Sequence, residues 1–198
     1  MVRVKLVLAS TSPYRAALLE TLKVPFQQLE PDYTESVDGP ETPAETASRH
    51  AQGKALGAPA LGESTLVCGA DQVAVCNGTV LHKPGNAQRA ASQLAACSGH
   101  WVEFTTGLCL QRAGQVVFLE TESYAVRFRQ LTPVEIDTYI GLDEPFHSAG
   151  SIKAESLGVS LLSDSRGRDI NTLYGLPLML FCDALASLGL SLPDFRDV

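Results

Sequence analysis

The sequence predicts one domain, residues 1–198, that combines strands with helices. Near-continuous apolar runs at 2–9 and 65–76 are typical of buried strands. Residues 42–45 and 132–135 both read Thr-Pro-x-Glu, which is a capping box with proline at the first helical position. Asn77-Gly78 is the strongest short-range signal for a hairpin. At 198 residues the chain can fill one large core and has room for two lobes.

Strand and helix signals alternate in the first half of the chain. Ser12 is a good N-cap, and Pro13 follows it at the first helical position. Residues 31–40 form an acidic loop, and the Gly and Pro residues of 57–63 indicate a linker. The expected elements are a strand at 2–9, a helix at 13–22, a short strand at 26–30, a helix at 43–56, a strand at 65–76 and its hairpin partner at 79–82.

The second half holds two long strands and three helices. Asn86 can cap the first of these helices, and Ser98-Gly99 ends it. Gly141 suits the C′ position after the helix that begins at the second capping box. The expected elements are a helix at 87–97, strands at 101–111 and 115–129, a helix from 133 to 140, a short strand at 159–162 and a final helix at 176–188.

Composition and charge exclude several classes of protein. Acidic residues outnumber basic ones by 22 to 15, and the net charge of −7 argues against a nucleic-acid or membrane-surface binder. A small anionic ligand is still allowed, because it responds to local charge. The five cysteines contain no Cys-x-x-Cys pair and suit buried thiols in a reducing compartment. Neither a signal peptide nor a membrane span is expected, so the predicted location is cytoplasmic.

Asp71 is an acidic residue inside a predicted buried strand. A carboxylate rarely stays inside a protein unless it is paired, binds a metal or takes part in chemistry. Its neighbours Gly69 and Ala70 are small, so another backbone or a ligand could approach closely. This stretch alone supports a structural and a chemical role for Asp71 equally.

A second candidate site lies where the first strand meets the first helix. The hydroxyls of Ser10 and Ser12, the exposed N–H groups and the helix dipole all suit an anion at this point. Arg15 in the first turn opposes the helix dipole unless an anion lies between them. A well-capped helix would explain the Ser-Pro pair alone, but Arg15 favours a phosphate site.

Further charged residues fall just beyond strand ends or in loops, where binding residues concentrate. They are the basic Arg15, Lys54, Lys83 and Lys153 and the acidic Glu35, Asp71 and Glu155. Together they suit metal-assisted phosphate chemistry, in which the basic groups hold phosphates and the carboxylates hold Mg²⁺ or activate water. The chain has no Gly-x-x-x-x-Gly-Lys loop, and its histidines lack ligand spacing, so we interpret His50, His82, His100 and His147 as structural or surface residues.

The chain resembles the Maf-like nucleoside triphosphate pyrophosphatases over about 170 residues. Residues 8–15, Leu-Ala-Ser-Thr-Ser-Pro-Tyr-Arg, resemble the opening motif of that family. Further segments follow in family order: Glu35, Ala51-Gln52-Gly53-Lys54-Ala55, Gly69-Ala70-Asp71, Lys83-Pro84, 128–132, 135–139, 149–153 and Gly175-Leu176-Pro177. Each segment is weak alone, and their joint order makes the resemblance strong.

The resemblance implies a fold, a reaction and a set of site residues. The fold is α/β, with an elongated mixed sheet flanked by helices and two lobes around a cleft. The reaction is hydrolysis between the α- and β-phosphates of a nucleotide, with a divalent cation, Mg²⁺ or Mn²⁺. The implied roles are general base for Asp71, substrate binding for Ser10, Arg15, Lys54 and Lys83, and metal binding for Glu35 with Asp71. The substrate is a small nucleotide, and a homodimer is plausible.

Three positions resemble a subgroup of the family that hydrolyses 7-methyl-GTP. Tyr14, Gln72 and Glu155 stand where that subgroup has an aromatic residue, Gln and Glu. An aromatic face attracts the positive ring of 7-methylguanine, and one carboxylate can accept from both N–H donors of guanine. Two alternatives stay open. The first is a pyrophosphatase for dTTP, UTP or modified pyrimidine nucleotides. The second is a non-catalytic nucleotide-binding regulator of septum formation.

Overall fold

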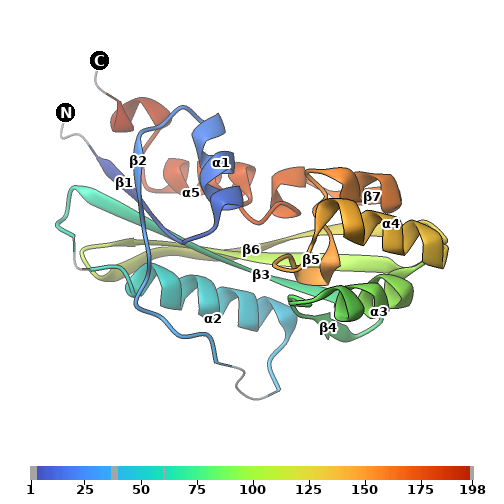
Figure 1. Ribbon diagram of the computed structural model, residues 1–198. Coiled ribbons are helices and arrows are strands. Elements are labelled where there is room, and N and C mark those ends of the chain that lie inside the picture. Colours follow the sequence, from blue (N-terminus) through green and yellow to red (C-terminus); the bar gives the residue numbers. More distant parts are fainter. Residues whose placement is uncertain (1–3, 37–39, 60, 197–198) are drawn as a thin grey trace.

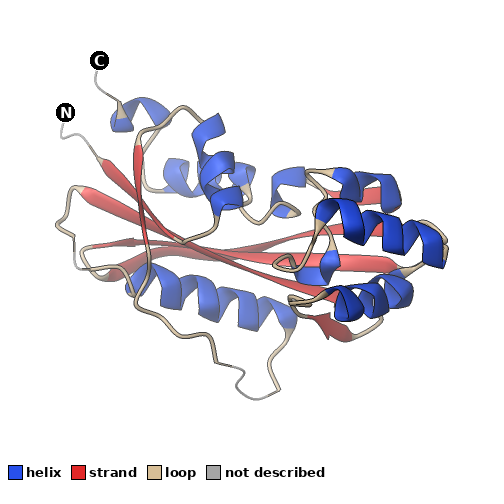
Figure 2. Ribbon diagram, in the orientation of Figure 1, coloured by secondary structure: helices blue, strands red, loops and turns tan. Residues whose placement is uncertain are grey.

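A computed structural model describes residues 4–36, 40–59 and 61–196. It is built on a seven-stranded sheet of order β2-β1-β3-β5-β6-β7, with β4 paired to β3. The strands are β1 (Lys5–Ala9), β2 (Phe26–Leu29), β3 (Thr65–Cys76), β4 (Thr79–Leu81), β5 (Trp101–Arg112), β6 (Gln115–Phe128) and β7 (Leu162–Gly167). β1 runs parallel to β2 and β3, whereas all other pairs are antiparallel. The predicted mixed, elongated sheet is confirmed, and Figure 2 shows its long strands running through the molecule.

Helices cover both faces of this sheet. They are α1 (Pro13–Thr21), α2 (Pro43–Leu56), α3 (Ala87–Cys97), α4 (Pro133–Asp143) and α5 (Leu178–Ser187), with short 3₁₀ turns at Ala149–Ser151, Leu157–Leu161, Ile170–Thr172 and Leu192–Phe195. Figure 1 shows α2 along one face, α1 and α5 across the other face near the chain ends, and α3 with α4 at the far end. No helix in the described ranges is long and apolar enough to cross a membrane.

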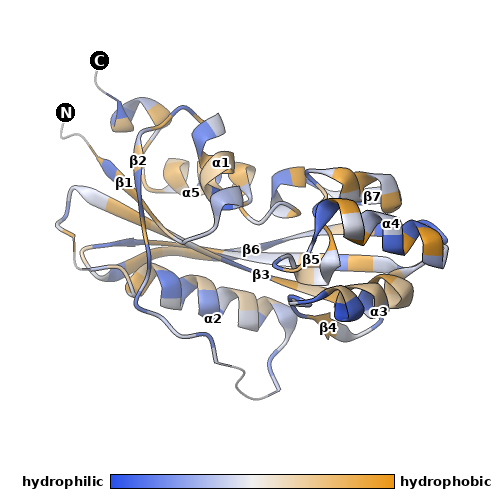
Figure 3. Cartoon of the chain, viewed as in Figure 1, coloured by the Kyte–Doolittle hydropathy of each residue, from blue (hydrophilic) through white to orange (hydrophobic). Residues whose placement is uncertain are grey.

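Two separate hydrophobic clusters form the two ends of the molecule. One cluster joins β1, α1 and α5 through residues such as Leu8, Leu19 and Phe181. The other joins α3 and α4 to the opposite end of the long strands through residues such as Leu94 and Phe128. In Figure 3, α5 is largely orange, whereas the strands and α2 mix orange, white and blue segments. The two clusters correspond to the two predicted lobes.

Local sequence signals fixed most element boundaries. Ser12, Thr42, Asn86 and Thr132 all cap helices through their side chains, and both predicted capping boxes form. At the hairpin, Asn77 and Gly78 have φ angles of 48° and 78°, as a type I′ turn requires. The start of the predicted strand 2–9 and part of the acidic loop 31–40 lie outside the described residues.

Three predicted boundaries were wrong. Gly141 lies inside α4, and Glu144 ends that helix in the left-handed conformation with φ of 44°. Residues 159–162 belong mainly to the 3₁₀ turn Leu157–Leu161, and the strand follows at Leu162–Gly167. The final helix begins at Leu178 with Pro177 as its N-cap, and the 3₁₀ turn Ile170–Thr172 and a short loop precede it.

Candidate active site

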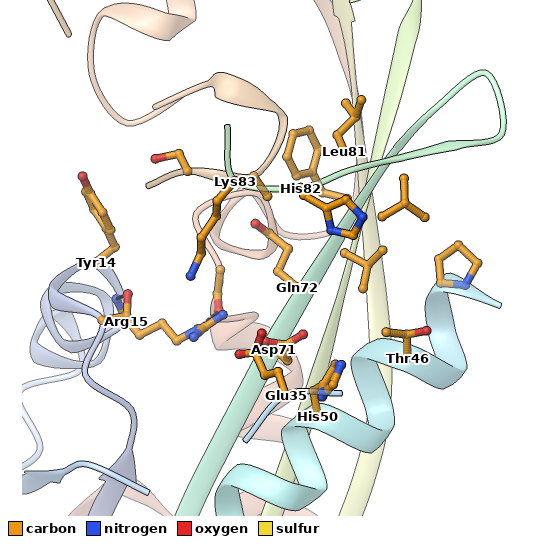
Figure 4. Close-up of a pocket in the computed structure, with 18 of the residues that line it drawn as sticks. Tyr14, Arg15, Glu35, Thr46, His50, Asp71, Gln72, Leu81, His82 and Lys83 are labelled. Atoms are coloured by element: carbon orange, nitrogen blue, oxygen red, sulfur yellow. Dashed lines mark hydrogen bonds between the residues drawn. The ribbon is translucent and has the colours of Figure 1, made fainter. Parts of the chain in front are cut away.

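A cavity of about 590 Å³ lies between the two hydrophobic clusters. Its walls come from α1, α2, β3, β4 and the segments around residues 35, 148 and 174. The lining includes eight of the predicted site residues: Tyr14, Arg15, Glu35, Lys54, Asp71, Gln72, Lys83 and Glu155. Figure 4 shows Arg15 and Lys83 pointing toward Asp71 from different elements. Residues far apart in the sequence therefore meet at one cavity.

A gap along one edge of β3 explains where the cavity lies. On this edge β1 pairs with β3 only as far as Cys68, and β4 pairs with it only from Ala74. Successive side chains on a strand point to opposite faces, so Asp71 and Gln72 point to different sides of the sheet. Because no strand among the described residues covers the edge at 69–73, both side chains line the same cavity.

The carboxylate of Asp71 is buried and paired with Lys54. Lys54 Nζ lies 2.5 Å from Asp71 Oδ1 and 2.6 Å from Glu35 Oε1. Asp71 is only 8% exposed, whereas half of the Glu35 side chain is exposed, at 52%. The ammonium of Lys54 therefore bridges a buried and a partly exposed carboxylate.

Two glycines bring α2 close enough to the sheet for this pairing. A Cβ on Gly69 would lie 2.4 Å from the Ala51 carbonyl oxygen, and one on Gly107 would lie 2.3 Å from that of Ala47. Real Cβ atoms do not approach so closely, so any side chain here would push α2 away from β3 and β5. The sequence predicted a close approach at Gly69, and the approaching group is the backbone of α2.

The ammonium group of Lys54 determines the direction in which the pKa of its neighbour Glu35 shifts. Partial burial alone would raise the pKa of Glu35, but the hydrogen bond and charge of Lys54 outweigh it, so this pKa lies below its ordinary value. Glu35 and Asp71 converge on one cation, as the ligands of a divalent ion would. Mg²⁺ commonly binds one or two carboxylates and completes its shell with substrate phosphates. The described residues contain no group of three or more His, Cys, Asp or Glu side chains that could hold a metal ion.

Arg15 is held at the end of the cavity next to α1. Its Nε donates a hydrogen bond to the Gly175 carbonyl oxygen at 2.8 Å. Gly175 has a φ of 101°, a conformation that favours glycine. Ser10 does not line the cavity, because it is buried and its hydroxyl accepts from the Ser12 N–H at 3.1 Å. Ser12 is the serine that faces the cavity.

The remaining predicted residues lie around the same cavity, except Lys153. Tyr14 is 37% exposed and lines the rim, as Glu155 does. Partial burial raises the pKa of Glu155, and the charge of Asp143 raises it further. Lys153 Nζ donates a hydrogen bond to the Asp143 carbonyl oxygen, and Lys153 does not line the cavity. Lys153 thus ties its own loop to the end of α4.

Three histidines line the cavity. From the sequence we interpreted all four histidines as structural or surface residues, and we did not expect them at the site. His50 is the most informative, because it is 6% exposed and its Nδ1 lies 2.9 Å from the Tyr33 hydroxyl. A sequence signal existed, since Thr46, His50 and Lys54 are spaced four residues apart and share one face of α2. His82 and His147 lie at exposed positions of the wall.

The fold and the cavity define an α/β protein with an inter-lobe site whose walls carry both carboxylates and basic groups. The family model described as Maf-like protein matches residues 5–188. The chain therefore belongs to the Maf-like family, which confirms the resemblance seen in the sequence.

Similar proteins carry one recurring name. A 7-methyl-GTP pyrophosphatase of Alcanivorax borkumensis is 43% identical over 192 residues, which cover 95% of this chain and 96% of that protein. A 7-methyl-GTP pyrophosphatase of Vibrio vulnificus is 42% identical over 190 residues, with 94% and 96% covered. Among solved structures, the Staphylococcus aureus Ham1 protein gives a TM-score of 0.43 at 13% identity, covering 64% of this chain and 72% of that one.

Proposed function

We propose that this chain is a nucleoside triphosphate pyrophosphatase that hydrolyses 7-methyl-GTP to 7-methyl-GMP and pyrophosphate, and so removes modified nucleotides. The observation that carries the proposal is the buried Asp71, paired with Lys54 at 2.5 Å in a cavity that Arg15 and Lys83 also line. Relatives named 7-methyl-GTP pyrophosphatase at 40–43% identity support the choice of substrate.

Asp71 is suited to accept a proton from the attacking water. Lys54 bonds to its Oδ1, while Oδ2 makes no hydrogen bond with the described residues and can accept that proton. The water oxygen adds to the α-phosphorus, the bond to the α–β bridging oxygen breaks, and pyrophosphate leaves with that oxygen. Asp71 takes the proton that the water loses.

Basic groups would offset the charge of the triphosphate. Arg15 is oriented by its bond to Gly175, so its two terminal NH₂ groups stay available for phosphate oxygens. Lys83 is exposed on the opposite wall and can approach the same phosphates. Glu35 and Asp71 are the residues that would hold Mg²⁺ or Mn²⁺, and such an ion, when bound, supplies further positive charge to the phosphates.

The rim residues would select the base. A 7-methylated guanine carries a positive charge, which the face of Tyr14 can attract. The Glu155 carboxylate can accept from the N1–H and the exocyclic N–H₂ of guanine together. Tyr174 adds a further aromatic ring to the lining. Partial burial raises the pKa of Tyr174, and the charge of Glu155 raises it further, as expected for neighbouring groups.

The decisive test is Asp71→Asn, which keeps the shape of the side chain and removes its basicity. We expect pyrophosphate release from 7-methyl-GTP with Mg²⁺ or Mn²⁺ to fall by roughly 10²–10⁴-fold, as for loss of a general base. The exposed Asp137→Asn on α4 is the matched control and should keep full activity. Activity of Asp71→Asn near that of the control would exclude Asp71 as the base.

A nucleotide panel tests the substrate. If kcat/KM favours UTP or dTTP over 7-methyl-GTP, the roles proposed for Tyr14 and Glu155 are wrong and the substrate is a pyrimidine nucleotide. If the protein binds nucleotide but never releases pyrophosphate, it is not an enzyme, and the alternative of a non-catalytic nucleotide-binding regulator is supported.

We also propose a cytoplasmic location, because all five cysteines are free thiols and four of them are buried. A homodimer stays a prediction, which the molar mass in solution can test.

A further inference from the structure

The side-chain amide of Gln72 is held from one side by three acceptors. Its Nε2 lies 2.7 Å from the Thr172 carbonyl oxygen, 3.2 Å from the Leu173 carbonyl oxygen and 3.1 Å from Thr106 Oγ1. Gln72 and Thr106 are direct cross-strand neighbours on β3 and β5. The loop that follows β7 thus closes over the same face of the sheet.

These contacts decide which way the amide points. Backbone carbonyl oxygens only accept hydrogen bonds, so the NH₂ group must face Thr172 and Leu173, and the oxygen must face away from them. The Gln72 oxygen makes no hydrogen bond with the described residues, and Figure 4 shows it on the cavity side. Gln72 therefore presents an acceptor, and no donor, to a ligand in the cavity.

Thr106 completes this arrangement. Its hydroxyl donates to the Thr172 carbonyl oxygen at 3.0 Å while it accepts from Gln72 Nε2. Thr106 and Thr172 are both fully buried, at 0% exposure, so water cannot replace the missing partner of a flipped amide. The loop is anchored again through Thr172 Oγ1, which donates to Glu122 Oε1 at 3.2 Å. Glu122 is the cross-strand neighbour of Thr106 on β6.

We propose that Thr106 is a positioning residue that locks the Gln72 amide with its oxygen toward the substrate, so that the cavity selects bases that present N–H donors. Guanine offers adjacent donors at N1 and at its exocyclic amine, and it can satisfy both Gln72 and Glu155. The N3–H donor of uracil or thymine lies between two carbonyl oxygens. A cavity wall that presents only hydrogen-bond acceptors repels these oxygens. This inference rests on the proposed function and deepens it.

The kinetic test compares Thr106→Val, which removes the hydroxyl at constant shape, with Thr106→Ser, which keeps it. We expect T106V to lose about 10-fold of the kcat/KM preference for 7-methyl-GTP over UTP, mainly through KM, because the amide loses one of its three acceptors and the Thr172 carbonyl oxygen loses the hydroxyl that donates to it. T106S should keep the preference within about 3-fold. If T106V prefers 7-methyl-GTP over UTP as strongly as the wild type does, Thr106 does not position the Gln72 amide.

A measurement on the wild-type protein keeps the proposal testable even if T106V does not fold. On titration with the product 7-methyl-GMP, the ¹³Cδ resonance of Gln72 should shift, while its side-chain NH₂ protons stay protected from exchange with solvent. Contacts from those NH₂ protons to the base would refute the proposed orientation. A wild-type preference for UTP would reject the proposed function instead, so the two failures are distinguishable.

Discussion

Gly69→Ala tests whether the position of α2 sets the catalytic geometry. The new Cβ would lie 2.4 Å from the Ala51 carbonyl oxygen and 2.5 Å from the Ala55 amide nitrogen. Both contacts are backbone atoms of α2, which cannot rotate away as a flexible side chain would. The helix must therefore move away from β3, and Lys54 moves with it.

The size of this movement follows from the contact itself. Restoring an ordinary separation of 3.4 Å from 2.4 Å requires a displacement of about 1 Å. Overpacking of this kind costs about 1–3 kcal/mol, which corresponds to a Tm lower by about 2–12 °C at this chain length. A misplacement of about 1 Å at a catalytic group can cost about 10²-fold in rate. We expect kcat to fall by that order, because Lys54 leaves Asp71.

Thermal unfolding and steady-state pyrophosphate release measure the two effects. Gly141→Ala is the matched control, because Gly141 lies inside α4 and, beyond its chain neighbours and its own helix backbone, no atom of the described residues lies within 4 Å of the added Cβ. It should gain about 0.5–1 kcal/mol from helix propensity and keep its activity. If Gly69→Ala keeps both the Tm and the kcat of the wild type, the close approach of α2 does not control the site.

Two further predictions concern charge and helix capping. The raised pKa of Glu155 means that this carboxyl takes up its proton at a higher pH than an ordinary glutamate. Binding of the base, which needs the ionised form, should therefore weaken as pH falls through that pKa. We expect the KM of the wild type for 7-methyl-GTP to rise on the acid side of neutrality. Glu155→Gln should show a KM about 10-fold higher with no such pH dependence, and parallel pH profiles would contradict this role. Thr132→Ala removes the capping hydroxyl of α4 and should lower stability by about 0.5–2 kcal/mol without changing kcat, since Thr132 does not line the cavity. An unchanged Tm would show that the cap contributes nothing.

Local signals predicted the elements of the fold because their causes are local. An N-cap such as Thr42 bonds to an amide three residues away, so its effect is visible in the sequence. The errors arose where distant packing decides. Gly141 is a typical helix terminator, yet α4 continues past it to Asp143, whose carbonyl oxygen accepts from Lys153 and whose carboxylate accepts from Ser156. At Leu157–Leu161, a 3₁₀ turn replaces the predicted strand, and the pattern of apolar residues does not distinguish the two.

Site residues were predictable by type and by family order, but their partners were not. The pairing of Lys54 with Asp71 depends on glycines in β3 and β5 that admit α2. Ser10 and Ser12 look equivalent in the sequence, and only the fold shows that Ser10 is buried beneath the helix start. No property of the segment around Gln72 predicts that its amide nitrogen contacts a loop 100 residues away.

One loop links the two ends of the cavity. Gly175 accepts from Arg15 at the phosphate end, and Thr172 accepts from Gln72 at the base end, so only two residues separate the two anchors. The buried Asp169 fixes this loop, because its carboxylate accepts from the Asn171 N–H at 2.9 Å and from the Met179 N–H at the start of α5 at 2.8 Å. A loop tied to α5 in this way cannot shift at one anchor without straining the other. The spacing between phosphate contacts and base contacts is therefore set by the chain itself, and a substrate must match it to use both.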